Sequence, residues 1–245
     1  MRRALLATAL LAASPALADL SSLTDAERES FRAEVRAYLV ENPEVLMEAL
    51  AVLDAREQQA QAAADDALVA SNLDAILNDG TSWVGGNPDG DVTVVEFMDY
   101  RCGYCRHAFQ EVEDLVAGDG NVRFVLKEFP ILGAQSDLAS RFAVAVQQLH
   151  GEDAYKDAHD ALMVLEADVT PESLSRLAEG LAFDPAPILA RMDGPEVTSV
   201  IDANHALARD LGITGTPTFV MGGTMVRGYL PLDQMEGILA DERAG

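Results

Sequence analysis

The chain has 245 residues, of which 41 are acidic and 17 are basic, so its formal net charge is −24. This shortage of positive charge argues against a protein that binds nucleic acid or an anionic membrane surface, because lysine and arginine must neutralise such partners. The 49% of apolar residues suffice for a packed core, while two cysteines are too few for a disulfide-rich scaffold and supply at most half of a four-cysteine zinc site.

Residues 1–18 have the pattern of an export signal peptide. Two arginines at positions 2–3 precede an apolar stretch over residues 4–13, and Ala-Leu-Ala at 16–18 is the small-x-small motif that signal peptidase recognises. Removal of this segment takes both arginines away and makes the chain still more acidic. The pattern predicts export to a bacterial periplasm, a compartment in which disulfide bonds persist.

Residues 19–80 are predicted to form an N-terminal helical arm and linker. A capping-box motif begins at Thr24, and the pair Asn42-Pro43 separates two helical stretches, each with large apolar residues at helical spacing. Two interpretations of the arm remain open. Its apolar stripes either pack on the chain's own domain or associate with other copies of the chain through residues 21–78.

Residues 81–245 are predicted to form one α/β domain, which begins near a turn-rich boundary at 85–90. The β-branched run 92–97 predicts a strand, residues 102–117 predict a helix, and residues 122–129 predict a second strand. A strand, a helix and a strand in this order form a βαβ unit. We therefore expect the two strands to be parallel.

The rest of this domain begins with an alanine-rich helical insertion over about residues 135–211, in which breaks are predicted near Gly151, Thr170-Pro171 and Asp184-Pro185. Residues 218–221 and 224–227 flank a two-glycine turn and predict a β-hairpin. Residues 231–242 predict a closing helix. The insertion is too long for a simple crossover, so it is interpreted as a helical subdomain inserted into the sheet domain.

The motif Cys102-Gly103-Tyr104-Cys105 is the strongest chemical signal in the chain, because it starts the predicted helix directly after a strand. Unpaired N–H groups and the helix dipole stabilise a thiolate at a helix N-terminus, so Cys102 is predicted to be the nucleophile. Cys105 lies one turn further along and is placed to attack a mixed disulfide. The alternatives are a structural disulfide and half of a metal site. Neither is favoured, since the ring would be small and the four histidines show no tight ligand spacing.

Residues 93–105 and the later motif Gly215-Thr216-Pro217-Thr218 together resemble the thioredoxin-fold proteins of the bacterial Dsb (disulfide bond) group. The likeness runs from about Trp83 to the C-terminus and includes the helical insertion. The resemblance implies a thioredoxin fold, a cis proline at Pro217 beside the cysteine pair, and a backbone at Thr216 that pairs with a substrate strand. Gly103 and Tyr104 complete the candidate substrate-binding residues.

Glu96, six residues before Cys102, resembles the buried acid of the same family. A carboxylate beneath the cysteine pair can take the proton from Cys105 as that thiol attacks. The alternative is a strand residue that faces solvent, with Val95 and Phe97 facing inward. Glu96 is therefore a candidate catalytic residue together with Cys102 and Cys105.

The dipeptide between the cysteines and the residue before the proline indicate the subtype. Gly103-Tyr104 with Thr216 resembles the disulfide isomerases, whereas strongly oxidising members resemble Pro-His between the cysteines with Val before the proline. Without a histidine between the cysteines, weaker thiolate stabilisation predicts a milder oxidant. The arm also resembles the N-terminal region of the suppressor-of-copper-sensitivity C proteins, some of which form trimers.

The resemblance thus implies a periplasmic thiol–disulfide oxidoreductase, an isomerase or reductase, that acts on exported cysteine-containing proteins. The implied partners are a membrane redox protein that keeps the pair reduced and further copies of the chain in a trimer or dimer; neither a cofactor nor a metal is required. Two alternatives remain. One is a dithiol oxidase in the manner of the Dsb oxidants, and the other is a copper-binding or chaperone-like protein that uses the C-x-x-C motif as a metal site.

Overall fold

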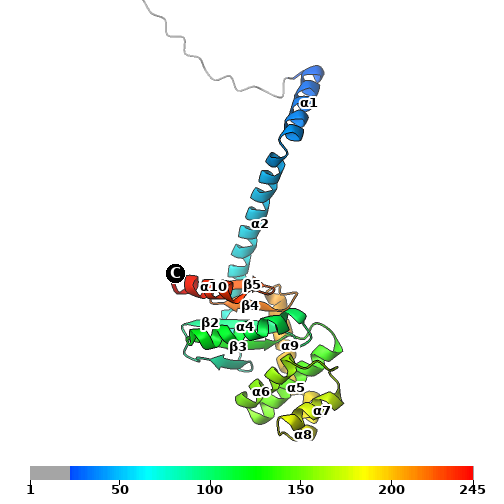
Figure 1. Cartoon of the computed structure of the whole chain (residues 1–245), viewed down its shortest axis with the longest axis vertical. Coiled ribbons are helices and arrows are strands. Elements are labelled where there is room, and N and C mark those ends of the chain that lie inside the picture. The colour runs from blue at the N-terminus through cyan, green and yellow to red at the C-terminus, as the bar shows by residue number, and fades with distance from the viewer. Residues whose placement is uncertain (1–22, 245) are drawn as a thin grey trace, which may run out of the picture. The chain divides into compact units, whose positions relative to one another are not determined.

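The computed structural model describes residues 23–244, so the predicted signal peptide at 1–18 lies outside the described residues. Contacts between residues divide the chain into a first unit, which ends at Glu57, and a second unit, which begins at Gln58. Figure 1 labels most of the helices and strands.

The first unit is helical, as the arm's apolar spacing predicts. Helix α1 spans Asp25–Glu41, and helix α2, Glu44–Ser71, begins in this unit. The capping box at Thr24 is confirmed, because the hydroxyl of Thr24 accepts from the N–H of Glu27 and the N–H of Thr24 donates to the carboxylate of Glu27 at 2.8 Å. No residue of α1 is buried within the described chain.

A five-stranded sheet with strand order β1-β3-β2-β4-β5 forms the centre of the second unit. Its strands are β1 Trp83–Gly86, β2 Val92–Met98, β3 Val122–Glu128, β4 Thr218–Met221 and β5 Thr224–Arg227. Strands β2 and β3 are parallel, and the other neighbouring pairs are antiparallel. The predicted βαβ unit and hairpin are therefore confirmed. Strand β1 was not predicted, because half of its residues are glycines, which are depleted in strands.

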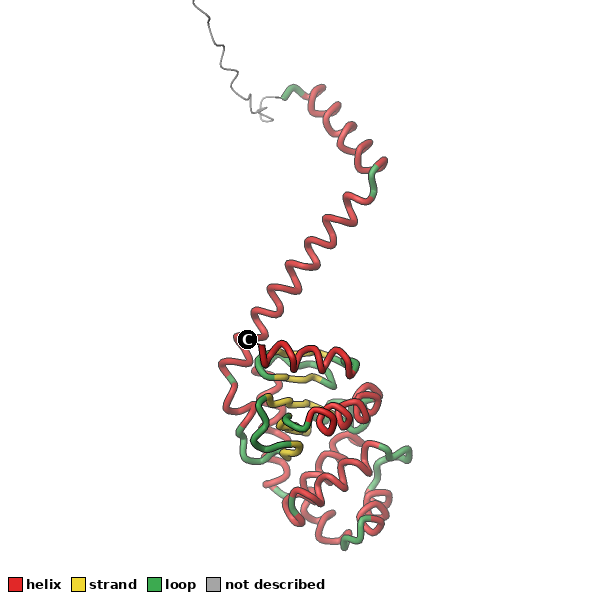
Figure 2. The backbone as a smooth tube through the Cα atoms, turned by 60° about the vertical axis from the view of Figure 1, so that its left-hand side comes forward, coloured by secondary structure: helices red, strands yellow, loops and turns green. Residues whose placement is uncertain are grey.

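Helices make up the rest of the second unit (Figure 2). They are α3 Leu73–Leu77, α4 Gly103–Asp119, α5 Ala134–His150, α6 Glu152–Met163, α7 Pro171–Gly180, α8 Pro185–Met192, α9 Pro195–Asp210 and α10 Leu232–Ala244. Helix α4 connects β2 to β3, and α5 to α9 form the predicted insertion between β3 and β4. The insertion has one more break than predicted, at Asp193-Gly194. The chain thus has a mixed α/β thioredoxin-like sheet with inserted helices and N-terminal helices.

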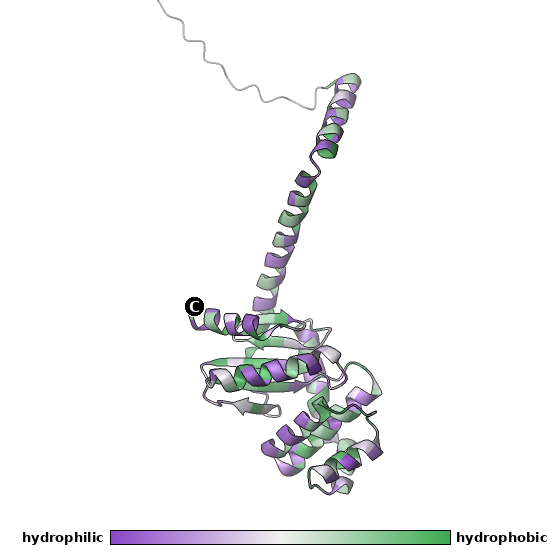
Figure 3. Ribbon diagram, viewed as in Figure 1, coloured by the Kyte–Doolittle hydropathy of each residue, from purple (hydrophilic) through white to green (hydrophobic). Residues whose placement is uncertain are grey.

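Both faces of the sheet are covered by helices. Along β2, Val94 and Met98 belong to a hydrophobic cluster with α4, α5 and α10, whereas Val95 and Phe97 belong to a second cluster with α3, α9 and the end of α2. A strand buried on both faces needs apolar residues at nearly every position. Figure 3 accordingly colours the central strands mostly as hydrophobic. By alternation, Glu96 lies on the face that α4 covers.

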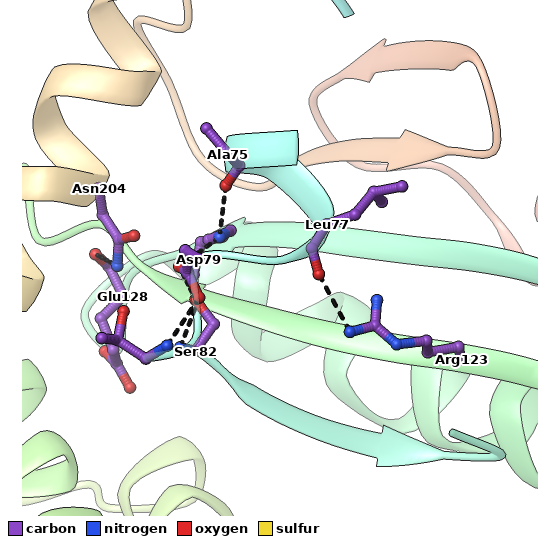
Figure 4. A network of polar contacts seen from close by, with 9 residues as sticks. Ala75, Leu77, Asp79, Ser82, Arg123, Glu128 and Asn204 are labelled. Carbon is purple, nitrogen blue, oxygen red and sulfur yellow. Dashed lines mark hydrogen bonds and ion pairs between the residues drawn. The ribbon is translucent and has the colours of Figure 1, made fainter. Parts of the chain in front are cut away.

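A buried lysine holds the segment before β1 against the sheet, and Figure 4 labels its partners Ala75 and Asp79. Lys127 of β3 has a fully buried side chain, whose Nζ donates to the carbonyl oxygen of Ala75 at 3.1 Å and forms an ion pair with Asp79. Burial opposes ionisation of Asp79, but hydrogen bonds from Lys127, Ser82 and Thr81 hold its pKa down at about 2. This network fixes α3 and the start of β1 against the strand that neighbours β2.

Candidate functional site

Cys102 is the N-cap residue of α4, directly after the loop that follows β2. Its backbone is extended, with φ −74° and ψ 118°, and its Sγ accepts from the N–H of Cys105 at 3.5 Å. As a thiol, Cys102 Sγ donates to the carbonyl oxygen of Thr216 at 3.2 Å. The predicted nucleophile therefore lies at the helix N-terminus and faces the proline loop.

The surroundings of Cys102 favour its thiolate. The thiol of Cys105 donates to the Cys102 sulfur, and hydrogen bonds from Thr216 and from the backbone N–H groups of Cys105 and Tyr104 add to this effect. Partial burial opposes it, and the pKa of Cys102 settles at about 5. The Cys102 residue is only 6% exposed. The hydrogen-bond donors around its sulfur stabilise the thiolate in place of the water molecules that burial removes.

Cys105 has the opposite environment, one helical turn further along α4. It is fully buried in the hydrophobic cluster beneath α4, and burial raises the pKa of its thiol far above the ordinary value. The hydrogen bond that it donates to Cys102 and the charge of Glu96 raise this pKa further. Both cysteines are free thiols in this structure. Cys105 can therefore attack only after a base has taken its proton.

The segment that carries Thr216 and Pro217 precedes β4 and lies against the cysteines. The peptide bond between these two residues is cis, as the family resemblance implies. Pro217 is buried, and its carbonyl oxygen accepts from the N–H of Gly228 at 2.9 Å. Thr216 is half-buried and presents its carbonyl to Cys102. The fold thus brings together two motifs that are far apart in the sequence.

Glu96 is buried, with 3% exposure, and its Oε1 has no hydrogen-bond partner among the described residues. The alternative of a solvent-facing Glu96 is wrong because helices cover both faces of β2, so that Val95, Glu96 and Phe97 are all buried. Burial, the charge of a Cys102 thiolate and the charge of Glu113 raise the pKa of Glu96 to about 8. A carboxyl group next to the cysteine pair can thus carry a proton at neutral pH.

The two residues between the cysteines are at the surface. Gly103 and Tyr104 are both exposed, Tyr104 to 66%. The ring of Tyr104 stacks on Tyr229 with 6.4 Å between ring centroids. His107, one turn along α4, is exposed, and its ring centroid lies 4.7 Å from that of Tyr229.

Asp99, which sequence reasoning missed, holds the loop between β2 and α4. Its fully buried carboxylate accepts from the backbone N–H of Arg101 at 2.7 Å, of Ile131 at 2.8 Å and of Leu132 at 3.0 Å. Its carbonyl oxygen accepts from the N–H of Cys102 at 3.1 Å. The only sequence signal is an acidic residue at the end of a strand, which is common in turns.

A second buried carboxylate lies behind the same loop. Glu128 Oε1 accepts from the hydroxyl groups of Tyr100 at 2.8 Å and Tyr155 at 2.6 Å, and burial raises the pKa of Glu128 to about 7. Asn204 of α9 donates to the Glu128 carbonyl oxygen at 3.0 Å (Figure 4). These residues come from four separate parts of the chain, so no local pattern indicates the cluster.

Arg106 also connects α4 to the inserted helices. It donates to the carbonyl oxygens of Tyr100 and Leu165, both at 2.7 Å, and of Leu162 at 3.4 Å. Arg101 donates to the carbonyl oxygen of Ala167 at 3.4 Å. The two basic residues that flank the cysteines are therefore engaged with the backbone between α6 and α7.

Within residues 23–244, no group of three or more His, Cys, Asp or Glu side chains is arranged to hold a metal ion. Each helix in the same part of the chain is too short or too polar to cross a bilayer.

Comparison with known proteins decides the family of this site. The family model described as a DSBA-like thioredoxin domain matches residues 93–240, which is more than half of the chain and includes both cysteines, Thr216 and Pro217. The chain belongs to the DSBA-like thioredoxin domain family. A second model, described as the N-terminal domain of the copper resistance protein ScsC, matches residues 27–60.

Solved structures of DSBA-like proteins agree with this assignment. A thioredoxin-like oxidoreductase from Silicibacter pomeroyi is 41% identical to the chain, with a TM-score of 0.66 over 70% of this chain and 98% of that one. A linker-deletion variant of ScsC from Proteus mirabilis is 28% identical, with a TM-score of 0.67 over 92% of this chain and 99% of that one. The second of these similarities extends into the N-terminal helices.

Among curated proteins, the chain is similar to a part of much longer ones. It is 27% identical to the Na(+)/H(+) antiporter NhaA of Herminiimonas arsenicoxydans over 66% of this chain and 26% of that protein. The chain thus spans about a quarter of the length of the first curated relatives that it matches. The similarity covers only this part of each antiporter. The function of the rest of the antiporters is therefore not assigned to this chain.

Proposed function

We propose that the chain is an exported thiol–disulfide oxidoreductase that acts on the disulfide bonds of exported proteins, as an isomerase or reductase rather than as a primary oxidant. The observation that carries this proposal is the position of Cys102 Sγ at the N-terminus of α4, 3.2 Å from the Thr216 carbonyl oxygen. The family match supports exchange chemistry. The residues Gly103, Tyr104 and Thr216 support the choice of an isomerase.

In the proposed first step, the Cys102 thiolate attacks one sulfur of a substrate disulfide. A bond forms between Cys102 Sγ and that sulfur, the substrate S–S bond breaks, and the other sulfur leaves with the electron pair. In isomerisation, this new thiolate attacks a different disulfide of the substrate. A substrate thiolate later attacks the mixed disulfide and releases Cys102 as a thiolate, so no net electrons move.

In reduction, Cys105 ends the reaction instead. Its thiol loses a proton, its sulfur attacks Cys102 Sγ, and the substrate sulfur leaves as a thiolate. A disulfide then joins Cys102 and Cys105, and the substrate has gained two electrons. A membrane redox protein is the proposed source of the electrons that return the pair to its dithiol form.

Glu96 is the proposed acceptor of the Cys105 proton. The charge of the Cys102 thiolate contributes to the raised pKa of Glu96. This charge disappears when Cys102 enters a mixed disulfide, so the pKa of Glu96 falls and its carboxylate becomes available as a base. Both the Glu96 carboxyl group and the Cys105 thiol are buried, which keeps them away from water.

Refolding of ribonuclease tests the isomerase proposal. Full-length chain without residues 1–18 should restore activity to scrambled, fully oxidised ribonuclease in a glutathione buffer. Cys105→Ser should retain part of this rescue, since isomerisation needs only the Cys102 thiolate, whereas Cys102→Ser should lose it. Rapid oxidation of reduced ribonuclease with no rescue of scrambled ribonuclease would establish the dithiol oxidase alternative instead.

Self-association is proposed for the first unit. Its exposed apolar side chains include Phe31 at 50%, Tyr38 at 55%, Leu46 at 49% and Leu50 at 53% exposure. A groove of about 390 Å³ is lined by apolar residues of α1, by Leu46 of α2 and by Arg32 and Arg36. The match of residues 27–60 to the ScsC N-terminal domain supports further copies of this chain as the partner, in a trimer or dimer.

A further inference from the structure

Two tyrosine rings lie side by side next to the nucleophile. Tyr104 is the residue before Cys105 and is 66% exposed, and its ring lies nearly parallel to that of Tyr229, with an interplanar angle of 24°. Tyr229 is half-buried in the loop between β5 and α10. We call the rings of Tyr104 and Tyr229 the tyrosine platform. Tyr104 is a candidate substrate-binding residue, but the proposed exchange steps do not use Tyr229 or the pairing of the two rings.

The platform is held in place from both halves of the redox site. The Tyr229 hydroxyl donates to the carboxylate of Glu111 on α4, with 3.0 Å to each oxygen. The neighbouring Gly228 donates its N–H to the carbonyl oxygen of Pro217 at 2.9 Å. These contacts hold Tyr229 against α4 and the proline loop, and the exposed ring of Tyr104 stacks on it.

The charges around the platform favour a cation. The face of an aromatic ring is electron-rich and attracts lysine and arginine side chains. The Glu111 carboxylate lies 3.0 Å from the Tyr229 hydroxyl, so its negative charge can also act on a cation bound at the ring. Burial, this hydrogen bond and the negative charges of Glu111 and Asp233 raise the pKa of Tyr229. Arg101 and Arg106 instead donate to carbonyl groups of residues 162–167.

We propose that the tyrosine platform is a specificity subsite that takes a lysine or arginine side chain close to the reactive cysteine of a substrate polypeptide. The proposal rests on the exchange reaction at Cys102 described above. When the substrate cysteine is bonded to Cys102 Sγ, residues one or two positions away in an extended chain lie within about 7 Å of it along the strand. A long basic side chain at these positions reaches across Tyr104. The chain has 41 acidic and only 17 basic residues, and this negative net charge also favours basic substrates.

Peptide mixed disulfides test the subsite. Each peptide has one cysteine bonded to thionitrobenzoate and is flanked on both sides by arginine, glycine, glutamate or tryptophan. Release of thionitrobenzoate by the reduced full chain gives a second-order rate. We expect the arginine peptide to react about two- to fivefold faster than the glycine peptide, and the glutamate peptide to react most slowly.

Variants of the platform separate its effect from that of the general negative charge. The ratio of arginine to glycine rates within one protein cancels any overall loss of reactivity. Tyr229→Leu should lower this ratio, whereas Tyr229→Phe should preserve it because the ring remains. Glu111→Gln should lower the ratio only in part, because it removes the negative charge but its amide oxygen still accepts from the Tyr229 hydroxyl.

The outcomes distinguish the two proposals. An unchanged ratio in Tyr229→Leu would overturn the subsite. If the native chain prefers the tryptophan peptide and Tyr229→Leu loses this preference, the subsite binds an aromatic side chain of the substrate. That result would also overturn the proposal of a subsite for lysine or arginine. If no peptide releases thionitrobenzoate, the exchange reaction itself is wrong, whatever the platform binds.

Discussion

Cys102 and Cys105 are chemically identical side chains three positions apart, yet their surroundings give them opposite acidities. Cys102 receives hydrogen bonds from Cys105, Thr216 and two backbone N–H groups, and its pKa is about 5. Cys105 receives little compensation for its burial, and its pKa is raised. The helix start alone does not explain this contrast. The donors that come from outside α4 and the depth of the second cysteine complete the explanation.

The first prediction concerns Thr216. Thr216→Val keeps the side-chain shape but removes a hydroxyl donor to the thiolate, so the pKa of Cys102 should rise from about 5 by about one unit. A higher thiolate pKa destabilises the reduced form. The reduction potential should therefore become more negative by about 30 mV. Absorbance at 240 nm and equilibrium with glutathione measure the two quantities.

Thr216→Ser is the control for this prediction, because it retains the hydroxyl and should leave the thiolate pKa close to that of the native chain. A pKa of about 5 lies between the values of about 7 for thioredoxin and about 3.5 for the strong oxidant DsbA. We accordingly expect a native potential between about −270 and −120 mV. A value at the oxidising end of this range would contradict the isomerase proposal.

The second prediction concerns Glu96→Gln, which keeps the shape of the side chain but cannot accept the Cys105 proton as a carboxylate. Resolution of a Cys102 mixed disulfide should slow by about 10- to 100-fold in single-turnover quenched-flow measurements. The attack of Cys102 on a small disulfide should change much less. Equal slowing of both steps would show that Glu96 acts on Cys102 rather than on Cys105.

The same substitution should stabilise the reduced protein at neutral pH. The folded pKa of Glu96 is raised from 4.5 to about 8, so the group is protonated in both states below pH 4.5, and its pKa shift lowers the free energy of unfolding as pH rises from 4.5 towards 8. Removal of this ionisable group should raise the free energy of unfolding at pH 7 by on the order of 2 kcal/mol. At pH 4, denaturant titrations should show little difference between the two proteins.

At the scale of secondary-structure elements, the sheet depends on a segment that the sequence assigns to the arm. Val69 of α2 and Ile76 of α3 are buried in the hydrophobic cluster of one sheet face, and Lys127 of β3 is buried against Ala75 and Asp79. The arm and linker predicted over residues 19–80 thus include residues that complete the core of the second unit. A truncation that begins at residue 80 would expose this face of the sheet.

The third prediction concerns Asp79→Asn, which leaves the Lys127 ammonium group buried without its counter-ion. The free energy of unfolding should fall by about 3 kcal/mol at pH 7, measured by urea titration. Because the folded pKa of Asp79 is lowered from 3.8 to about 2, its contribution is fully present above pH 4 and is lost as pH falls towards 2. The difference between native and variant chains should therefore shrink in acid.

Asp66→Asn is the matched control, since Asp66 is an exposed acid in the same part of the chain and should change stability by less than about 0.5 kcal/mol. An equal effect of the two substitutions would show that net charge, and not the buried pair, determines the result.

At the scale of the whole molecule, the first unit leaves its apolar side chains exposed. Leu46 and Leu50 lie one turn apart on α2 and are about half exposed, at 49% and 53%. Apolar area of this kind favours association, because its removal from water is worth about 25 cal/mol per Å². Further copies of the chain would cover it in the proposed oligomer.

The fourth prediction is that the double variant Leu46→Glu, Leu50→Glu is monomeric, whereas the native chain without residues 1–18 is a trimer or dimer. Sedimentation equilibrium measures both. Glu48→Gln on the same helix is the control and should leave the oligomer intact. A monomeric native chain would refute self-association through this unit, and the thionitrobenzoate release assay would then still test the redox site separately.

Several features of this protein follow from the sequence alone. The thiolate-forming motif at Cys102, the parallel strands around α4, the hairpin before α10 and the capping box at Thr24 are local. Each depends on one motif or on elements that follow one another directly in the chain, so spacing and residue type suffice. The link between Cys102 and Thr216 required the family resemblance, because no local pattern joins positions so far apart.

Tertiary structure decided the rest. Glu96 is buried because helices cover both faces of β2, which strand alternation cannot show. The carboxylates of Asp99 and Glu128 and the tyrosine platform depend on partners from distant segments. The acidity of Cys102 also depends on Thr216, which the fold brings next to it. Local spacing and residue type therefore predicted which sulfur atoms react, whereas the packing of distant segments set their pKa values and the surface beside them.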